Sequence, residues 1–317
     1  MSSRPLKILK VASAATRVLP LSVLNPVAAA VASRVGPRMM PDKAAMLGRH
    51  LRRVGDHSTG AGDRNQEPGQ PAATVGAGFG SYARYWVESF RLPSVGLRQL
   101  DRGFSFIGYE HIEQVRASGI GPVLVLPHLG GWEWAAAWLG RVAEVPVSAV
   151  VERLEPDDVF EWFKNLRASW GVEVIPLGPD AFGRIVRAVR DGSIVCLLVD
   201  RDIGGNGVEV EFFGERTTLP VGPAVVASRT GAPILPTAVF FSGPQRICRV
   251  GAPIYADARF APDERALSDA TRLQGRERHQ ALTQRMATEL ERLIEQAPEQ
   301  WHLLEPNWPS DRRRLEL

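Results

Sequence analysis

The sequence predicts an α/β protein with a central, mostly parallel sheet flanked by helices. Short apolar runs rich in β-branched residues recur between residues 122 and 250, and segments with helical periodicity separate them. The chain has 317 residues, of which 44% are hydrophobic, so it is long enough to bury a sizeable core. A basic region of different composition precedes this alternating part.

Residues 1–54 are predicted to form a basic, helical, membrane-associating region. The first 53 residues contain ten lysines and arginines and a single acid, Asp42. The uncharged stretch 18–33 is interrupted by Pro20 and Pro26 and falls short of the ~20 apolar residues that span a bilayer. We therefore expect this region to lie on an anionic membrane surface. A packed helix pair and a secretory signal are the alternatives.

Residues 55–80 are rich in glycine, proline and polar residues, and they predict a flexible loop. The glycines at 76–80 resemble a phosphate-binding loop superficially, but no strand precedes them, so we discount that interpretation. Tyr82, Trp86 and Phe90 then recur at a four-residue spacing, which predicts a helix packed against the core.

Residues 81–308 are predicted to form the α/β domain. The expected strands are 122–126, 147–151, 172–176, 194–199, 234–240 and 247–250, and the expected helices are 132–142, 157–170, 180–191 and 222–230. Residues 207–215 alternate strictly, as in a half-exposed strand that runs into a turn. A long amphipathic helix at about 276–296 follows, and residues 309–317 form a C-terminal tail.

Several function classes are disfavoured by the sequence. It contains no Walker motif and no G-x-S-x-G elbow, which argues against a P-loop NTPase and a conventional serine hydrolase. Its two cysteines, Cys196 and Cys248, form no CxxC pair, and no histidine lies near them to suggest a metal site. A reducing cytoplasm fits this composition.

His128 carries the clearest chemical signal. It follows the expected strand 122–126, and Gly130 and Gly131 then lead into a helix that has Glu133 in its first turn. His128 therefore lies at the carboxyl end of a strand, where open α/β sheets bind ligands. A carboxylate on one ring nitrogen would free the other nitrogen to deprotonate a hydroxyl. We expect Glu133 to orient His128; a structural histidine is the alternative.

This pattern resembles the glycerolipid and lipid A late acyltransferases, in which a histidine and an acidic residue separated by four positions follow a hydrophobic strand. The resemblance runs from about Tyr82 to Trp308, and within the superfamily it is greatest to the actinobacterial phosphatidylinositol mannoside acyltransferases. The matching stretches are Val151–Leu154, Gly171–Leu177, Asp200–Asp202, Val210–Thr217, Pro220–Pro223 and Trp301–Trp308.

The resemblance implies transfer of a palmitoyl-type chain from acyl-CoA, as co-substrate, to a mannose hydroxyl of a phosphoinositide-type glycolipid acceptor. It further implies a peripheral protein on the cytoplasmic face of the plasma membrane. Asp200 occupies the position of a family glutamate that assists the catalytic histidine and is shorter by one methylene. No bound cofactor and no nucleic acid partner are expected. No metal is expected either, because the sequence contains no ligand cluster for one.

Three arginines are candidates for substrate binding. Arg153, Arg167 and Arg201 offer forked, permanently charged donors for the phosphates of CoA or for the phosphoinositol of the acceptor. The resemblance places Arg167 near the thioester, and Glu152 is included as a neighbour of Arg153. A surface or structural ion pair is the alternative for each arginine.

We expect an oxyanion site at the turn around Phe212 and Phe213, beside Thr217. Backbone N–H groups of this segment could hold the thioester oxygen. A plain hairpin with buried phenylalanines is the alternative. The tryptophans of the helix 132–142 could line an acyl groove, but they do not share one helical face, so at least one should contact only the core.

Three other functions remain open from the sequence. The first is acyl transfer to another lipid acceptor, either lauroyl or myristoyl transfer to a glucosamine lipid or acylation of a lysophospholipid. The second is a noncatalytic lipid-binding protein of the same fold, which would not need both His128 and Glu133. The third is a thioesterase that uses water as the acceptor. The match over residues 200–219 and 301–308 favours the mannoside enzyme.

Overall fold

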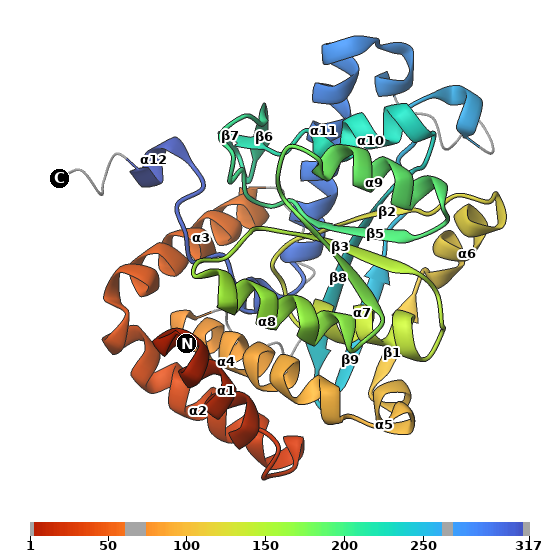
Figure 1. The fold of residues 1–317 in the computed structure, drawn as a ribbon. Coiled ribbons are helices and arrows are strands. Elements are labelled where there is room, and N and C mark those ends of the chain that lie inside the picture. Colours follow the sequence, from red (N-terminus) through yellow and green to blue (C-terminus); the bar gives the residue numbers. More distant parts are fainter. Residues whose placement is uncertain (1–2, 61–73, 262–268, 313–317) are drawn as a thin grey trace.

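A seven-stranded sheet with the order β1-β9-β8-β2-β5-β3-β4 forms the centre of the molecule (Figure 1). The computed structural model describes residues 3–60, 74–261 and 269–312. The strands are β1 (Phe104–Ile107), β2 (Val123–Leu126), β3 (Val147–Val151), β4 (Val172–Pro176), β5 (Ile194–Leu198), β8 (Ile234–Ser242) and β9 (Gln245–Val250). Strands β8, β2, β5, β3 and β4 run parallel, whereas β9 is antiparallel to β8. The predicted, mostly parallel α/β class is confirmed.

Helices cover both faces of this sheet (Figure 1). One face carries α4 (Val75–Arg91), α5 (Leu97–Arg102), α6 (Tyr109–Ala117), α7 (Trp132–Arg141) and α8 (Asp157–Ala168); the other carries α9 (Ala181–Arg190), α10 (Gly222–Thr230) and α11 (Gly275–Ile294). Because strand side chains alternate, Val123 and Val125 pack into one core while Leu124 and Leu126 pack into the other. Burial on both faces explains why the strand sequences are continuously apolar.

A short hairpin and several short helices complete the α/β part. The hairpin consists of β6 (Val208–Phe212) and β7 (Glu215–Leu219), which pair antiparallel. The short helices are η1 (Leu92–Ser94), η2 (Ala258–Phe260), η4 (Asp269–Arg272), η5 (Pro298–Gln300) and α12 (Pro309–Arg312). The strict alternation of residues 207–215 therefore predicted the first strand of the hairpin and its turn.

Three helices, α1 (Arg4–Ala15), α2 (Leu21–Met39) and α3 (Pro41–Gly60), form the N-terminal region. They lie beside α4 in Figure 1, and α2 packs along α4. The side chain of Asn25 on α2 donates to Glu88 of α4 over 2.7 Å, which fixes one face of α2 to the domain. Within the part of the chain that the structure describes, no helix is long and apolar enough to cross a membrane.

Helices occupy parts of two segments that were predicted as a loop and a tail. The loop expected at 55–80 is helical at both ends, because α3 continues to Gly60 and α4 begins at Val75, where the Thr74 side chain caps it by accepting from the N–H of Ala77. Residues 61–73 lie outside the described residues. The tail expected at 309–317 begins as α12, in which Asp311 is buried.

Candidate active site

His128 is held in a tight loop between β2 and α7. Gly130 of this loop has a φ of +58°, and a Cβ atom there would lie 1.8 Å from the carbonyl oxygen of Val239, so only glycine fits. The N–H of Gly130 donates to Gln300 over 2.9 Å, and the N–H of His302 donates to the carbonyl of His128 over 2.7 Å. The C-terminal segment thus fixes the backbone that carries the histidine.

Asp200 is the carboxylate that contacts the imidazole. It lies two residues after the end of β5, the strand beside β2, and it is fully buried. Its Oδ1 lies 2.6 Å from Nδ1 of His128, while Oδ2 accepts from the backbone N–H of His128 at 2.9 Å and from the indole N–H of Trp301 at 2.7 Å. Asn307 donates to the Asp200 carbonyl over 2.9 Å. Because a carboxylate only accepts, Nδ1 of His128 is the donor, and Nε2 is the basic nitrogen.

The surroundings keep Asp200 ionised and a neighbouring histidine neutral. Burial acts to raise the pKa of Asp200, but the charge of His128 and the hydrogen bonds from His128 and Trp301 outweigh it, so this pKa lies below its ordinary value. His302, whose Nε2 lies 2.9 Å from the Ser81 hydroxyl, has its pKa lowered to about 3 by burial and by the nearby charge of His128. The site therefore combines the negative charge of Asp200 with the neutral imidazole of His302.

Glu133 belongs to a separate buried cluster. Its Oε1 accepts from Arg167 at 2.6 Å and from the hydroxyl of Tyr85 at 3.1 Å. Burial and the Glu133 charge raise the pKa of Tyr85 well above its ordinary value, whereas for Arg167 the attraction of Glu133 outweighs burial and raises the pKa. The hydrogen bond that we expected Glu133 to accept from His128 is not formed among the described residues. Asp200 makes it instead, because β2 and β5 are neighbours in the sheet.

A cavity of about 900 Å³ lies in front of His128, whose side chain is 32% exposed. Its apolar lining comes from Trp86, Trp132, Phe182, Ile185, Leu197 and Val226. Within the part of the chain that the structure describes, Nε2 of His128 has no hydrogen-bond partner. The basic nitrogen is therefore available to a molecule in this largely apolar cavity.

The three predicted arginines all line this cavity, together with Glu152. Each also forms an ion pair: Arg153 with Asp157 at 3.1 Å, Arg201 with Glu152 at 3.3 Å, and Arg167 with Glu133. The guanidinium of Arg167 lies 5.4 Å from the ring centre of Trp132. Both interpretations of these residues are therefore compatible with the geometry. Arg167 is the most buried of the three, with 13% of its side chain exposed.

The predicted oxyanion site at Phe212, Phe213 and Thr217 is not part of the described cavity lining. Phe212 and Phe213 are buried, the N–H of Phe213 donates to Glu291, and the Thr217 hydroxyl donates to the carbonyl of Asn307. A donor that is already engaged inside the protein cannot hold a thioester oxygen. The alternative interpretation, a hairpin with buried phenylalanines, describes this segment correctly.

The three tryptophans of α7 point in different directions, as their spacing in the sequence predicts. Trp132 lines the cavity at His128, whereas Trp134 is buried and donates to the carbonyl of Leu100 over 3.1 Å. Trp138 donates to Asp101 over 2.9 Å. Only one of the three is therefore available to an acyl chain in this cavity.

Three contacts of the site were missing from the sequence prediction: those of Trp301, Asn307 and Tyr85. Trp301 and Asn307 lie in the matching stretch 301–308, but that stretch gave no indication that their side chains meet Asp200. Tyr85 lies one residue before Trp86 in a helix that was predicted only to pack. These contacts join residues that are far apart in the sequence, so they follow only from the order of strands and helices in the fold.

The chain matches known proteins over the same region. A family model described as bacterial lipid A biosynthesis acyltransferase matches residues 11–310. A phosphatidylinositol mannoside acyltransferase of Mycobacterium tuberculosis (strain ATCC 25618 / H37Rv) is 36% identical over 246 residues, which cover 76% of this chain and 72% of that protein. The protein of the same name from Mycolicibacterium smegmatis (strain ATCC 700084 / mc(2)155) is 35% identical over 253 residues, which cover 78% of this chain and 77% of that protein.

Proposed function

The chain belongs to the bacterial lipid A biosynthesis acyltransferase family, and from this premise we propose that it transfers a palmitoyl-type chain from acyl-CoA to a mannose hydroxyl of a phosphatidylinositol mannoside. Its class, an acyltransferase, follows from the family and from the names of the relatives. The acceptor is proposed from the relatives' names. The observation that supports the chemistry is His128, held by buried Asp200 with its basic nitrogen available to the cavity.

In the proposed reaction, Nε2 of His128 takes the proton of the acceptor hydroxyl as that oxygen attacks the thioester carbonyl carbon. The tetrahedral intermediate then expels the CoA thiolate, which receives the proton from the imidazolium. Asp200 stabilises the imidazolium through the 2.6 Å contact to Nδ1. No acyl-enzyme is formed, so both substrates occupy the site together.

The cavity supports an amphiphilic donor. Its apolar lining suits a fatty acyl chain, and the exposed Arg153 with the half-buried Arg201 offers cationic donors for the phosphates of CoA or of phosphoinositol. Glu133 holds Arg167 and Tyr85 beside the cavity, so its role in this proposal is to position them.

The test is release of CoA thiol from palmitoyl-CoA by the purified full-length protein, with and without phosphatidylinositol mannoside. We expect the acceptor to stimulate release, and His128→Ala to lower turnover by at least ~100-fold because the general base is lost. His279→Ala, on α11 and outside the cavity lining, is the matched control and should retain full activity.

Other outcomes separate the competing functions. Release that does not respond to this acceptor, but disappears in His128→Ala, would favour a thioesterase or another lipid acceptor. Absence of release from any acyl thioester, by a folded protein, would favour the noncatalytic lipid-binding alternative. Full activity of His128→Ala would contradict the site assignment itself.

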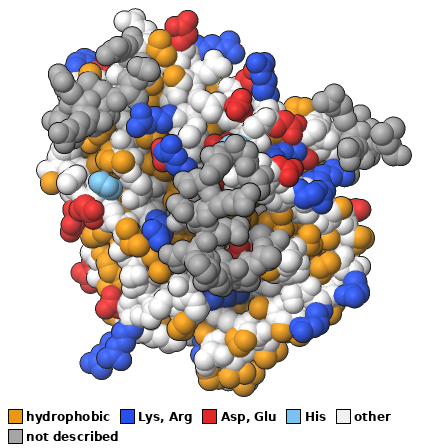
Figure 2. All heavy atoms as spheres, turned by 180° about the vertical axis from the view of Figure 1, so that it is seen from behind, with side chains coloured by type: hydrophobic (Ala, Val, Ile, Leu, Met, Phe, Trp, Pro, Cys, Tyr) orange, Lys and Arg blue, Asp and Glu red, His pale blue; other side chains and the backbone are white. Residues whose placement is uncertain are grey.

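We further propose that α2 docks the protein on an anionic membrane at its cytoplasmic face. Exposed apolar residues recur every four positions along one side of this helix: Val23, Val27, Val31, Val35 and Met39. The opposite side is fixed to α4 through Asn25, so the apolar side faces outward. In the view from behind, hydrophobic side chains gather at the lower end of the molecule, where α1 and α2 lie in Figure 1 (Figure 2). Exposed Arg34 and Arg38 on the same helix suit anionic headgroups.

Vesicle flotation tests this docking. Val27→Ser/Val31→Ser should lose binding to vesicles that contain phosphatidylinositol, whereas Ile107→Ser, which removes an exposed apolar side chain from β1, should not. Equal binding of both variants and the wild type would contradict docking through α2.

A further inference from the structure

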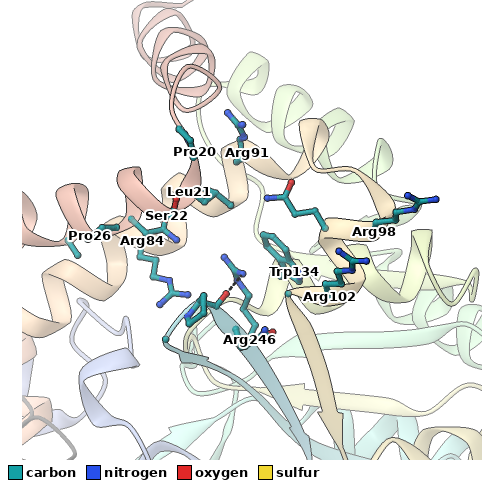
Figure 3. A pocket seen from close by; sticks show the side chains of 17 residues that line it. Pro20, Leu21, Ser22, Pro26, Arg84, Arg91, Arg98, Arg102, Trp134 and Arg246 are labelled. Carbon is teal, nitrogen blue, oxygen red and sulfur yellow. Dashed lines mark hydrogen bonds between the residues drawn. The ribbon is translucent and has the colours of Figure 1, made fainter.

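A second cavity, of about 1040 Å³, shares no lining residue with the cavity at His128 (Figure 3). Its walls come from α2, α4, α5, α7, the start of β9 and the turn between β8 and β9. Two helices separate the cavities: Tyr85 and Trp132 line the first, whereas Arg84 and Trp134 line the second. Successive helical residues differ in direction by roughly 100°, so α4 and α7 each present one side to each cavity.

Guanidinium groups dominate this second cavity, which we call the arginine pocket. Its five cationic lining residues are Arg84, Arg91, Arg98, Arg102 and Arg246, and none of its described lining residues is acidic. The buried carboxylate of Glu88 pairs with Arg84 and Arg246. One carboxylate against five guanidiniums leaves a strong excess of positive charge, which a concave surface concentrates.

The inner two arginines are fixed before any ligand arrives. Arg246 has a side chain only 5% exposed, lies 3.8 Å above the ring centre of Trp134, and donates to Glu88 and to the carbonyl of Pro244. The guanidinium of Arg84 lies 4.1 Å from the ring centre of Phe241. Its Nη2 is buried without a hydrogen-bond acceptor among the described residues. Fixed guanidiniums lose little conformational entropy when they bind an anion.

The outer arginines are free to reach a ligand. Arg98 and Arg102 on α5 are exposed, and the described part of the structure gives their side chains no ion pair or hydrogen bond. Figure 3 shows them on the side of the pocket opposite Arg84. An anion between the two groups would receive forked N–H donors from more than one direction, which is how arginine recognises phosphate.

The wall of the pocket that α2 forms is mostly apolar. Pro20, Leu21, Pro26 and Ala29 line it, together with the polar residues Ser22 and Asn25. The exposed apolar side chains of Val23 and Val27 belong to the same part of α2. A cationic wall that faces an apolar wall suits a molecule with a phosphate at one end and hydrocarbon at the other.

We propose that the arginine pocket binds a phosphate-bearing ligand at a site separate from the acyl-transfer site. The shared chemistry is a phosphate ester with net negative charge, supplied either by a lipid headgroup or by a soluble phosphate compound. This inference does not depend on the reaction at His128, because the two cavities have no lining residue in common.

Calorimetric titration of the full-length protein tests it. The probes are dihexanoyl phosphatidylglycerol below its critical micelle concentration, glycerol 3-phosphate, and zwitterionic dihexanoyl phosphatidylcholine. We expect saturable binding of one anionic probe per chain, weakened about tenfold or more in Arg98→Gln/Arg102→Gln, since each arginine near an anionic lipid contributes roughly a fivefold gain in affinity. Arg190→Gln/Arg229→Gln removes the same charge from exposed arginines that line neither cavity, and it should change the affinity by less than about twofold.

The affinities of the two anionic probes distinguish the source of the phosphate. Tighter binding of the lipid than of glycerol 3-phosphate supports a headgroup, and equal binding of both supports a soluble phosphate compound. No saturable binding of either anionic probe, binding of phosphatidylcholine with equal affinity, or equal weakening in both double variants would overturn the proposal. Thiol release should persist in the pocket variant, which separates this site from the one at His128.

Discussion

Asp200 and Glu133 are both buried carboxylates near one cavity, but they are stabilised by different partners. Asp200 accepts three hydrogen bonds, from the ring and backbone of His128 and from Trp301, and it has no arginine or lysine partner among the described residues. Glu133 pairs with the cation Arg167 and accepts from Tyr85. Proximity in sequence therefore does not identify the partner of the histidine. The carboxylate five residues from His128 stabilises a cation, and the one after the neighbouring strand contacts the imidazole.

Asp200→Asn should cause the largest loss of turnover. The side-chain amide would either place its NH2 group against Nδ1 of His128 or allow the other tautomer of the ring. Turnover should therefore fall on the order of 10³-fold. The thiol-release assay at saturating palmitoyl-CoA measures this loss, and circular dichroism checks the fold. Asp180→Asn, at the N-cap of α9 and outside the cavity lining, is the matched control. A loss of less than about threefold would show that Asp200 does not orient the base.

Glu133→Gln should have a different signature. The amide oxygen can still accept a hydrogen bond, but buried Arg167 loses its negative partner, so the free energy of unfolding should fall by about 2–4 kcal/mol. Turnover should fall less than in Asp200→Asn, about tenfold, because Arg167 and Tyr85 shift beside the cavity. Urea unfolding and thiol release measure the two effects.

Glu152→Gln is the control for this variant, because its ion pair with Arg201 is partly exposed. Such a pair contributes about 0–1 kcal/mol, so stability should barely change. If Glu133→Gln left stability unchanged and abolished turnover as completely as Asp200→Asn, the two carboxylates would share one role and the comparison would fail.

The sequence was sufficient for the parts of this molecule that depend on local pattern. Five of the six expected strands begin within one residue of their predicted starts, because strands buried on both faces are continuously apolar and bounded by turns. His128 and Gly130 were also correctly placed, since a strand, a histidine and two glycines occupy one short stretch. Strand β1 and helix α6 were missed because their short segments mix polar and apolar residues.

The contacts of the site could not be predicted in the same way. Asp200 lies 72 residues from His128 and Trp301 lies 101 residues from Asp200, so both contacts depend on the order of strands in the sheet. Alternation of strands and helices predicts a parallel sheet but does not say that β5 lies beside β2. The family resemblance identified Asp200 as a helper of the histidine, whereas the residue pattern alone favoured Glu133.

Trp301→Phe tests how much the indole N–H contributes to holding Asp200. The ring would still pack against Phe212, Phe213 and Trp308, but Asp200 would lose one of its three donors. Turnover should fall about five- to tenfold with KM unchanged, as expected for about 1 kcal/mol of lost hydrogen bonding. Steady-state kinetics measure both parameters. A change in KM alone would mean that Trp301 shapes the cavity instead of supporting Asp200.

The last prediction concerns the pH dependence of stability, through His302, which contacts both clusters. Its backbone N–H donates to His128, and its ring lies 5.7 Å from that of Tyr85. Burial and the charge of His128 lower its pKa from 6.5 to about 3, so the folded protein binds fewer protons than the unfolded chain between these values. The stabilising contribution is complete above pH ~6.5 and is lost as the pH falls through this window.

Between pH 7.5 and pH 5, this group alone should remove about 2 kcal/mol from the free energy of unfolding, since each pH unit within the window corresponds to ~1.4 kcal/mol. Urea unfolding at the two pH values measures the loss, and an unchanged denaturant slope confirms that the unfolded state is the same. His302→Gln retains a partner for Ser81 without a titrating ring, so it should lose less stability over this interval. An equal loss in the variant would show that other groups, including carboxylates, cause the loss of stability at low pH. It would contradict the contribution assigned to His302.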